Sequence, residues 1–134
     1  MIKKVLGSVL LTLSLMANDV VVDPETGLMW QDSSTIVSKS WSSAKNYCSE
    51  LILKGQSDWR LPHIDELMSI TDRSKYNPAI KSIFKHTKSS WYWSSTEYKD
   101  NSSKAWLVSF SNGNGNYYAK SDDYYVRCVR GGRQ

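Results

Sequence analysis

Few side chains in this sequence could support covalent catalysis. His63 and His86 are the only histidines among the 134 residues, and neither has a nucleophile at a spacing typical of a catalytic site. Asp65 and Glu66 are adjacent acids, but neighbouring positions on a helix do not face each other, and a first helical turn favours acids in any case. The sequence therefore predicts a protein that is not an enzyme, with an enzyme as the third choice among the functions considered below.

Cys48 and Cys128 are the only cysteines. In an exported protein, one intramolecular pairing is possible, and it would close a loop of about 81 residues. Two buried thiols or an intermolecular bridge are the alternatives. Two cysteines without paired histidine spacing do not make a zinc site. We therefore predict one disulfide, between Cys48 and Cys128, and no metal ligands.

Residues 1–17 have the composition of a signal peptide. Two lysines precede an apolar stretch from Val5 to Met16, and Ala17 offers a small residue for cleavage. The stretch is shorter than the roughly 20 residues of a membrane span. An uncleaved anchor or a first core helix is the alternative. We predict a periplasmic or secreted protein whose single domain is residues 18–134, with no membrane span after cleavage.

The charge of the domain is close to balanced. Without Lys3 and Lys4 in the leader, 15 basic residues face 13 acidic residues, which gives a formal net charge of +2. Such a balance gives no support for nucleic acid as a partner. Six tryptophans and eight tyrosines can instead supply large buried areas to a modest core.

The chain has helix patterns early and strand patterns late. Ser40 can cap a helix that starts at Trp41, with Gly55 as its left-handed C-terminal cap. Asn77 and Pro78 can open another short helix. We expect strands over these ranges: 20–22, 28–30, 90–95, 105–110, 116–120 and 124–129. Two or three short helices followed by a small twisted antiparallel sheet predict an α+β fold.

The segment from Trp59 to Leu67 is the predicted structural centre. Trp59 and Leu61 alternate as in a strand, Pro62 ends it, and an apolar stripe with helical spacing follows. Arg60 lies between apolar neighbours, so its guanidinium needs carboxylate or carbonyl partners if it turns inward. We expect structural roles for six residues: Trp59, Arg60, Pro62, Glu66, Trp93 and Arg127.

Two groups of residues are candidates for ligand binding. Lys81, Lys85 and Lys88 would form a basic row on the helix that Asn77 opens, which could meet a sulphated or carboxylated polymer; an ordinary solvated helix face is the alternative. The second group is polar and aromatic and follows the late strands, where loops on a rigid scaffold commonly bind. Its members are Tyr98, Asn101, Tyr117, Tyr118 and Tyr124. Alternating strands must bury many aromatic residues, and we assign these to the core: Trp30, Trp41, Trp59, Trp93 and Trp106.

Calcium is the only cofactor that the sequence suggests. The pairs Asp100–Asn101 and Asp122–Asp123 are rich in oxygen and could help to ligate it. As solvated loop residues they need no metal. The Glu-Pro-Asn, Gln-Pro-Asp and Trp-Asn-Asp elements with which C-type lectins bind sugar through calcium are absent. We predict no cofactor and no metal site.

Several landmarks together resemble one known family. They are Asp23-x-x-Thr26-Gly27-Leu28-Met29-Trp30, Trp41-x-x-Ala44-x-x-x-Cys48, Gly55-x-x-Asp58-Trp59-Arg60-Leu61-Pro62-x-x-x-Glu66-Leu67, Tyr92-Trp93-Ser94-Ser95-Thr96 and Val126-Arg127-Cys128-Val129-Arg130-Gly131. This order is similar to that of the C-terminal domain family of the Legionella collagen-like adhesin, a domain-of-unknown-function family. The resemblance covers nearly the whole mature chain. His63 departs from the pattern, because relatives often carry Thr or Ser there as the helix cap.

The resemblance implies both a fold and a function. The family resembles C-type lectin-like domains and the formylglycine-generating enzyme fold, which implies a compact domain with its ends together. In the named adhesin, the domain is associated with sulphated polysaccharides on host surfaces. That adhesin also has a collagen-like stalk, whereas this sequence has no Gly-X-Y repeat, so the resemblance does not carry over stalk-driven trimerisation.

We therefore expect an exported, non-catalytic binding or adhesion module. Its ligand would be an acidic or sulphated glycan, bound through the late loops and the basic helix face. The alternative is a small structural or assembly protein of the cell envelope that binds another protein. The expected partner is thus a glycan or an envelope or host-surface protein, and the oligomeric state is open.

Overall fold

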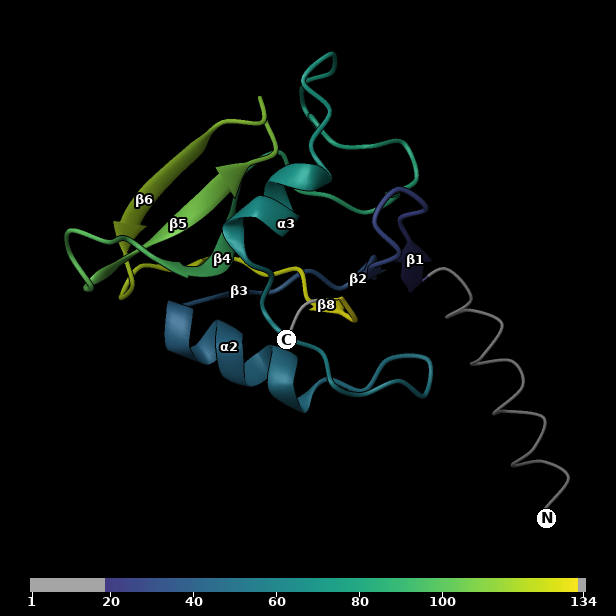
Figure 1. Ribbon diagram of the computed structural model, residues 1–134, viewed down its shortest axis with the longest axis horizontal. Helices are drawn as coiled ribbons and strands as arrows, with labels where there is room; N and C mark the ends of the chain where they lie inside the picture. Colours follow the sequence, from purple (N-terminus) through teal and green to yellow (C-terminus); the bar gives the residue numbers. More distant parts are fainter. Residues whose placement is uncertain (1–18, 133–134) are drawn as a thin grey trace, which may run out of the picture.

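The two ends of the folded domain meet in one small sheet (Figure 1). The computed structural model describes residues 19–132, and the predicted signal peptide lies outside this range. Strands β1 (Val20–Val22) and β2 (Met29–Gln31) form an antiparallel pair, and β8 (Val129–Arg130) pairs with the other side of β2. The turn between β1 and β2 is closed by the Asp23 carbonyl, which accepts the N–H of Gly27 at 2.8 Å. The predicted strand–turn–strand is thus confirmed.

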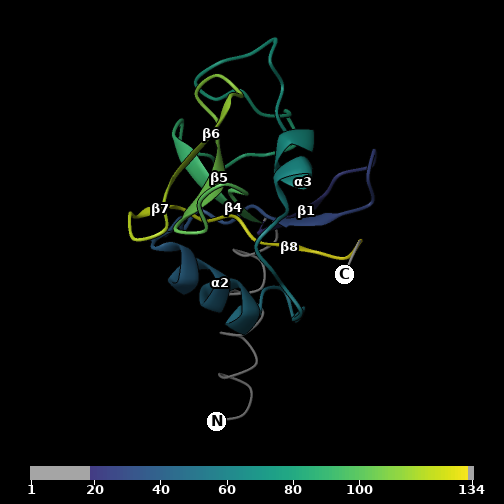
Figure 2. The same ribbon diagram turned by 60° about the vertical axis from the view of Figure 1, so that its left-hand side comes forward.

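A second sheet has five strands in the order β3-β7-β4-β5-β6 (Figure 2). Their bounds are β3 (Ser38–Lys39), β4 (Trp91–Glu97), β5 (Lys104–Ser109), β6 (Gly115–Ala119) and β7 (Tyr124–Tyr125). All neighbours are antiparallel except β4 and β7. The predicted strands 105–110 and 116–120 are confirmed as the hairpin of β5 and β6, but the predicted strand 124–129 is divided. Its two ends join different sheets, because Val126 to Cys128 cross between them through the buried interior.

Two hydrophobic clusters cover the two faces of this sheet. Helix α3 (Ile64–Ser69) contacts β4 and β5, and its Leu67 packs in one cluster with Val108. Helix α2 (Trp41–Glu50) contacts β4 from the other side, and its Cys48 packs in a second cluster with Leu107 (Figures 1 and 2). Since Leu107 and Val108 are consecutive strand residues, they point to opposite faces. The sheet is therefore buried on both sides through much of its length.

The disulfide joins the second cluster to the last segment of the chain. Cys48 and Cys128 are bonded, with their Cα atoms 5.5 Å apart and both side chains fully buried. This confirms the predicted pairing. The predicted helix end is wrong, however: α2 stops at Glu50 with an extended C-cap. Lys54 and Gly55, at φ 52° and 73°, instead form the turn between the bridged residues Leu53 and Gln56.

The predicted third helix is absent from residues 71–90, the teal segment of Figure 1. Its backbone groups bond to distant parts of the chain in place of a helical ladder. The Ala79 N–H donates to the Phe110 carbonyl at 2.7 Å, and the Lys81 N–H donates to the Ile70 carbonyl at 3.0 Å. Tertiary hydrogen bonds have therefore overridden a local helix signal.

The structure confirms the α+β class, with short helices, mostly antiparallel sheets and one disulfide. The C-type lectin-like assignment stays a prediction. Trp30, Trp59 and Trp93 are buried, and the half-buried Trp41 packs against the second cluster. Trp106 is half-buried and belongs to neither cluster, so its assignment to the core was wrong. No helix of residues 19–132 has the length and apolar character needed to cross a membrane.

Candidate binding surface

Arg60 ties the start of α3 to the end of the chain. Its guanidinium donates to both carboxylate oxygens of Glu66, each at 2.8 Å, and to the Gly131 carbonyl at 2.9 Å. Glu66 also accepts the backbone N–H of His63, the N-cap of α3, at 2.9 Å. Burial by itself would raise the pKa of Glu66, but the Arg60 and His63 bonds together lower it below its usual value. The charges of Arg60 and Glu66 are thus paired with each other, and their bonds hold the start of α3 against the last segment of the chain.

Arg127 and Asp32 form a second, deeper ion pair, with each side chain 3% exposed. Arg127 Nη1 lies 3.3 Å from Asp32 Oδ1 and donates to the Gln31 carbonyl, and Nη2 donates to the His86 carbonyl. The Asp32 carboxylate accepts the N–H groups of Lys85 and His86 at 2.9 and 3.0 Å. Sequence reasoning missed Asp32, which lies outside every helix and strand that it predicted.

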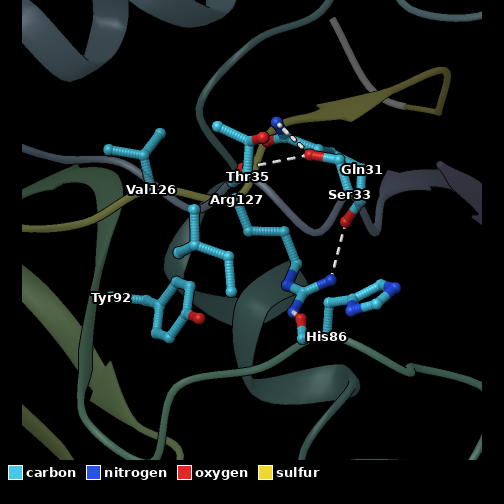
Figure 3. A pocket seen from close by; sticks show the side chains of 8 residues that line it. Gln31, Ser33, Thr35, His86, Tyr92, Val126 and Arg127 are labelled. Carbon is cyan, nitrogen blue, oxygen red and sulfur yellow. Dashed lines mark hydrogen bonds between the residues drawn. The ribbon is translucent and has the colours of Figure 1, made fainter.

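The cavity beside Arg127 is too small for a substrate. Figure 3 shows the side chains of Gln31, Ser33, His86 and Tyr92 around it. Its volume is about 10 Å³, close to the space of a single water molecule. This polar interior is therefore a structural feature that holds three distant segments together.

The predicted basic row does not exist, because the residues that should carry it are not helical. Lys81 Nζ bonds the buried carboxylate of Asp23 at 3.0 Å and also bonds Glu25. Burial would lower the pKa of Lys81, but these two carboxylates raise it. Lys85 Nζ donates to the Ser82 carbonyl, and the Lys88 backbone N–H donates to the Tyr92 hydroxyl. Lys81 and Lys85 thus have separate local side-chain partners, and without the helix the three lysines lose the spacing that would align them.

Tyr98 and Tyr117, by contrast, are brought together with Trp106. The two phenol rings stack with centroids 3.7 Å apart and planes 10° apart. Trp106 meets them edge to face at 5.8 and 5.2 Å, and Lys104 Nζ lies 5.7 Å from the Tyr117 ring. All four side chains are partly exposed. We call Tyr98, Trp106 and Tyr117 the aromatic triad.

The phenol groups of the triad also interact with each other. A hydrogen bond with Tyr117, together with desolvation and the charge of nearby Asp100, raises the pKa of Tyr98 to about 12. Asn101 lies in the same loop, where its side chain accepts the N–H and hydroxyl of Ser103 at 3.0 and 2.6 Å. Tyr98 is therefore neutral near pH 7, and the two tyrosines present hydroxyl groups beside an aromatic surface.

Tyr118 and Tyr124 belong to a different surface. Tyr118 follows Tyr117 in β6 and so points to the opposite face of the sheet. It stacks with Tyr124 at 5.7 Å and meets Trp91 edge to face at 5.4 Å, while Tyr124 contacts the buried Trp93. The tyrosine candidates thus divide between two faces, with only Tyr98 and Tyr117 in the triad.

A cation–aromatic group that sequence reasoning missed surrounds Trp41, on the α2 side of the sheet. Trp41 has Lys45 Nζ 4.3 Å and Lys120 Nζ 4.1 Å from its ring, and Lys120 also bonds the Glu97 carboxylate. The Lys120 N–H donates to the Ser103 carbonyl at 2.9 Å, which places Lys120 next to the loop of the triad. Lys45 also lines a surface pocket of about 300 Å³ between α2 and the Arg60–His63 turn. The helical spacing of Trp41 and Lys45 was a signal that could have indicated this pair.

Two of the four residues considered as possible calcium ligands have local partners. The Asn101 side chain closes its own turn, and Asp122 Oδ2 lies 3.5 Å from the Tyr124 hydroxyl. Between residues 19 and 132, no cluster of three or more His, Cys, Asp or Glu side chains is placed to hold a metal ion.

A comparison with protein-family models finds one that covers most of the chain. The model is described as Lcl C-terminal domain, and it matches residues 19–130. No curated protein matches the sequence. The matched range includes every strand of both sheets, the disulfide and the aromatic triad.

Proposed function

The chain belongs to the Lcl C-terminal domain family, and from this premise we propose that it is an exported, non-catalytic module that binds an acidic or sulphated glycan. Membership in the family of an adhesin domain supports a role in binding or adhesion. The disulfide is typical of proteins outside the cytosol. The periplasm or the cell exterior, a C-type lectin-like fold and a glycan ligand are parts of the proposal.

The aromatic triad is the observation that carries this proposal. Aromatic residues are usually placed in the core of so small a domain, yet Tyr98, Trp106 and Tyr117 lie together on the surface. Their partly exposed rings are typical of recognition surfaces, where rigid aromatic side chains supply contact area at low entropic cost. A sugar ring can place its C–H face on such a ring while its hydroxyls bond the phenol groups.

One lysine beside the triad and two lysines on the α2 side of the sheet favour an acidic ligand. Lys104 lies beside Tyr117, and Lys120 and Lys45 lie beside Trp41. Glu97 neutralises Lys120 in part, and the hydrogen bond between them lowers the pKa of Glu97. Sulphate or carboxylate groups along a polymer could contact the lysines in turn. Because these contacts are exposed, their contribution falls as salt screens them.

Retention of the exported protein on immobilised heparin tests the proposal, with dextran as the uncharged control polymer. We expect elution by moderate salt. Tyr117→Ala should weaken binding by about 1–2 kcal/mol, or roughly five- to thirtyfold. Lys104→Ala should weaken it less and reduce the salt dependence.

Two matched controls lie elsewhere on the surface. Tyr76 is 78% exposed and lies beside Asn77, whose N–H bonds the Ser111 carbonyl in the hairpin turn at the other end of β5. Tyr76→Ala and Lys75→Ala should bind heparin like the unmodified protein. Equal binding by Tyr117→Ala, Lys104→Ala and both controls would contradict this site. Salt-resistant capture of one envelope protein, without heparin binding, would favour the assembly role instead.

A further inference from the structure

Strand β6 is an edge of the five-stranded sheet, and its sequence lacks the usual protection of an edge. In residues 19–132 its only strand neighbour is β5 (Figure 1). Its five residues, Gly115 to Ala119, include no proline and no charged side chain. Natural proteins commonly place such residues on free edges to prevent pairing with other chains.

The hydrogen-bond pattern shows which residues of β6 face outward. The Lys120 N–H donates to the Ser103 carbonyl, and the Ser109 N–H donates to the Asn114 carbonyl. The backbone N–H and C=O groups of the even-numbered residues therefore point toward β5, because the direction of these groups alternates along a strand. The N–H and C=O groups of Gly115, Tyr117 and Ala119 point away from β5; the Ala119 carbonyl accepts the Asp122 N–H at 3.1 Å and keeps a second lone pair for a partner. The Tyr117 N–H is bonded by the neighbouring Asn116 side chain at 2.8 Å, which a partner carbonyl can replace.

We propose that β6 pairs with β6 of a second copy of this chain, antiparallel and centred on Tyr117. In this register Tyr117 faces Tyr117 of the second copy, and Gly115 faces Ala119. All three outward residues then fall in hydrogen-bonded pairs, and the small residues at both ends allow close approach of the backbones. Asn116 faces Tyr118, and these two side chains already bond within one chain at 3.2 Å.

The charges at the two ends of β6 suit this orientation. At one end, the Arg73 guanidinium is fixed to the Gly113 carbonyl at 3.0 Å. At the other end lie the exposed carboxylates of Asp122 and Asp123, while Lys120 is already paired with Glu97. Antiparallel pairing brings the arginine end of each copy to the acidic end of the other. A parallel pairing would bring like ends together.

The consequence is a continuous sheet that displays two aromatic triads on one face. Residues directly opposite in an antiparallel pair point to the same side. Two binding surfaces close together would strengthen attachment to a polymer without any new contact. The inference does not depend on the glycan, because it rests on the backbone of β6.

Sedimentation equilibrium of the exported protein tests the pairing directly. A contact over five residues is smaller than the about 1,200–2,000 Å² of a standard interface, so we expect a monomer–dimer equilibrium in the micromolar range. Ala119→Pro removes an outward N–H that the β5 ladder does not use, and should weaken dimerisation about tenfold or more. Ala119→Ser keeps the N–H and should dimerise like the unmodified protein. A monomer at every concentration, or undiminished dimerisation of Ala119→Pro, would overturn the proposal.

Cross-linking tests the register without relying on the proline variant. In the proposed pair the two Tyr117 Cα atoms are about 5.5 Å apart, within the range that a disulfide spans. Tyr117→Cys should therefore form a covalent dimer on mild oxidation. Ala119→Cys is the matched control, because the two copies of residue 119 are offset by roughly 13 Å along the strands. Dimers from Ala119→Cys but not from Tyr117→Cys would refute this register.

Discussion

Removal of the Asp32 carboxylate tests whether the buried ion pair holds residues 81–88 in place. Asp32→Ala deletes the partner of Arg127 and leaves the N–H groups of Lys85 and His86 without their acceptor. Loss of one partner from a buried pair commonly costs about 3–5 kcal/mol. Arg127 keeps the carbonyls of Gln31 and His86, so we expect a value near the lower end of that range, about 3 kcal/mol.

Urea unfolding, followed by tryptophan fluorescence with the disulfide intact, measures this loss. With a slope of about 1.5 kcal/mol per molar urea, the midpoint should fall by about 2 M. Asp123→Ala removes an exposed carboxylate as the matched control, and its free energy of unfolding should stay within about 0.5 kcal/mol of the unmodified protein. A change of less than about 1 kcal/mol for Asp32→Ala would refute the reasoning, since it is smaller than the cost of one unsatisfied buried group.

A double variant separates the cost of leaving the Arg127 charge unpaired from the loss of its contact with Asp32. Arg127→Met fills much of the same space without a charge. In the Asp32→Ala background it should restore about 1–2 kcal/mol of the lost free energy of unfolding, because replacement of both partners of a buried pair by apolar groups is often tolerated. Simple addition of the two single effects would show that the charges do not interact.

Three other outcomes follow from the same structure. Replacement of Cys48 and Cys128 by alanine should lower the free energy of unfolding by roughly 4.5 kcal/mol in the chain-entropy estimate, measured by urea unfolding beside the oxidised protein. The lowered pKa of Glu66 means that its stabilisation is complete above the unfolded pKa and is lost as pH falls through the folded pKa, so Glu66→Gln should flatten the loss of stability at acid pH. Glu97→Gln should free Lys120 and raise the salt needed to elute the protein from heparin, and unchanged elution would contradict the assigned charge balance.

The sequence predicted local features well, because their causes lie within a few residues. The hairpin after β5 follows from Asn-Gly turn chemistry, and the need of Arg60 for a carboxylate was visible six residues from Glu66. The disulfide was predictable once export was assumed, since only one pairing exists.

The predicted helix after Asn77 failed for a physical reason. Its apolar residues, such as Ile80 and Phe84, are buried as a helix stripe would require. The same spacing also suits an irregular segment whose N–H groups are bonded elsewhere. The Asp32 carboxylate accepts the N–H groups of Lys85 and His86, which are separated from it by 53 and 54 positions in the sequence. It also bonds Arg127, at a separation of 95 positions. No local pattern in the sequence indicates such distant partners, so a helix was predicted here. The basic row was wrong for the same reason, because it depended on that helix.

The loop that carries Tyr98 of the triad is closed by its own hydrogen bonds, and this favours recognition that varies independently of the fold. The Tyr98 N–H donates to the Lys104 carbonyl at 2.9 Å, and the Lys104 N–H returns to the Asn101 carbonyl at 3.0 Å. The two ion pairs and the disulfide that hold the domain together lie outside this loop. Substitutions at Asn101 or its exposed neighbours can therefore move Tyr98 over Tyr117 without cost to the core. Ligand choice within the family should accordingly change with this loop, while the frame beneath it stays the same.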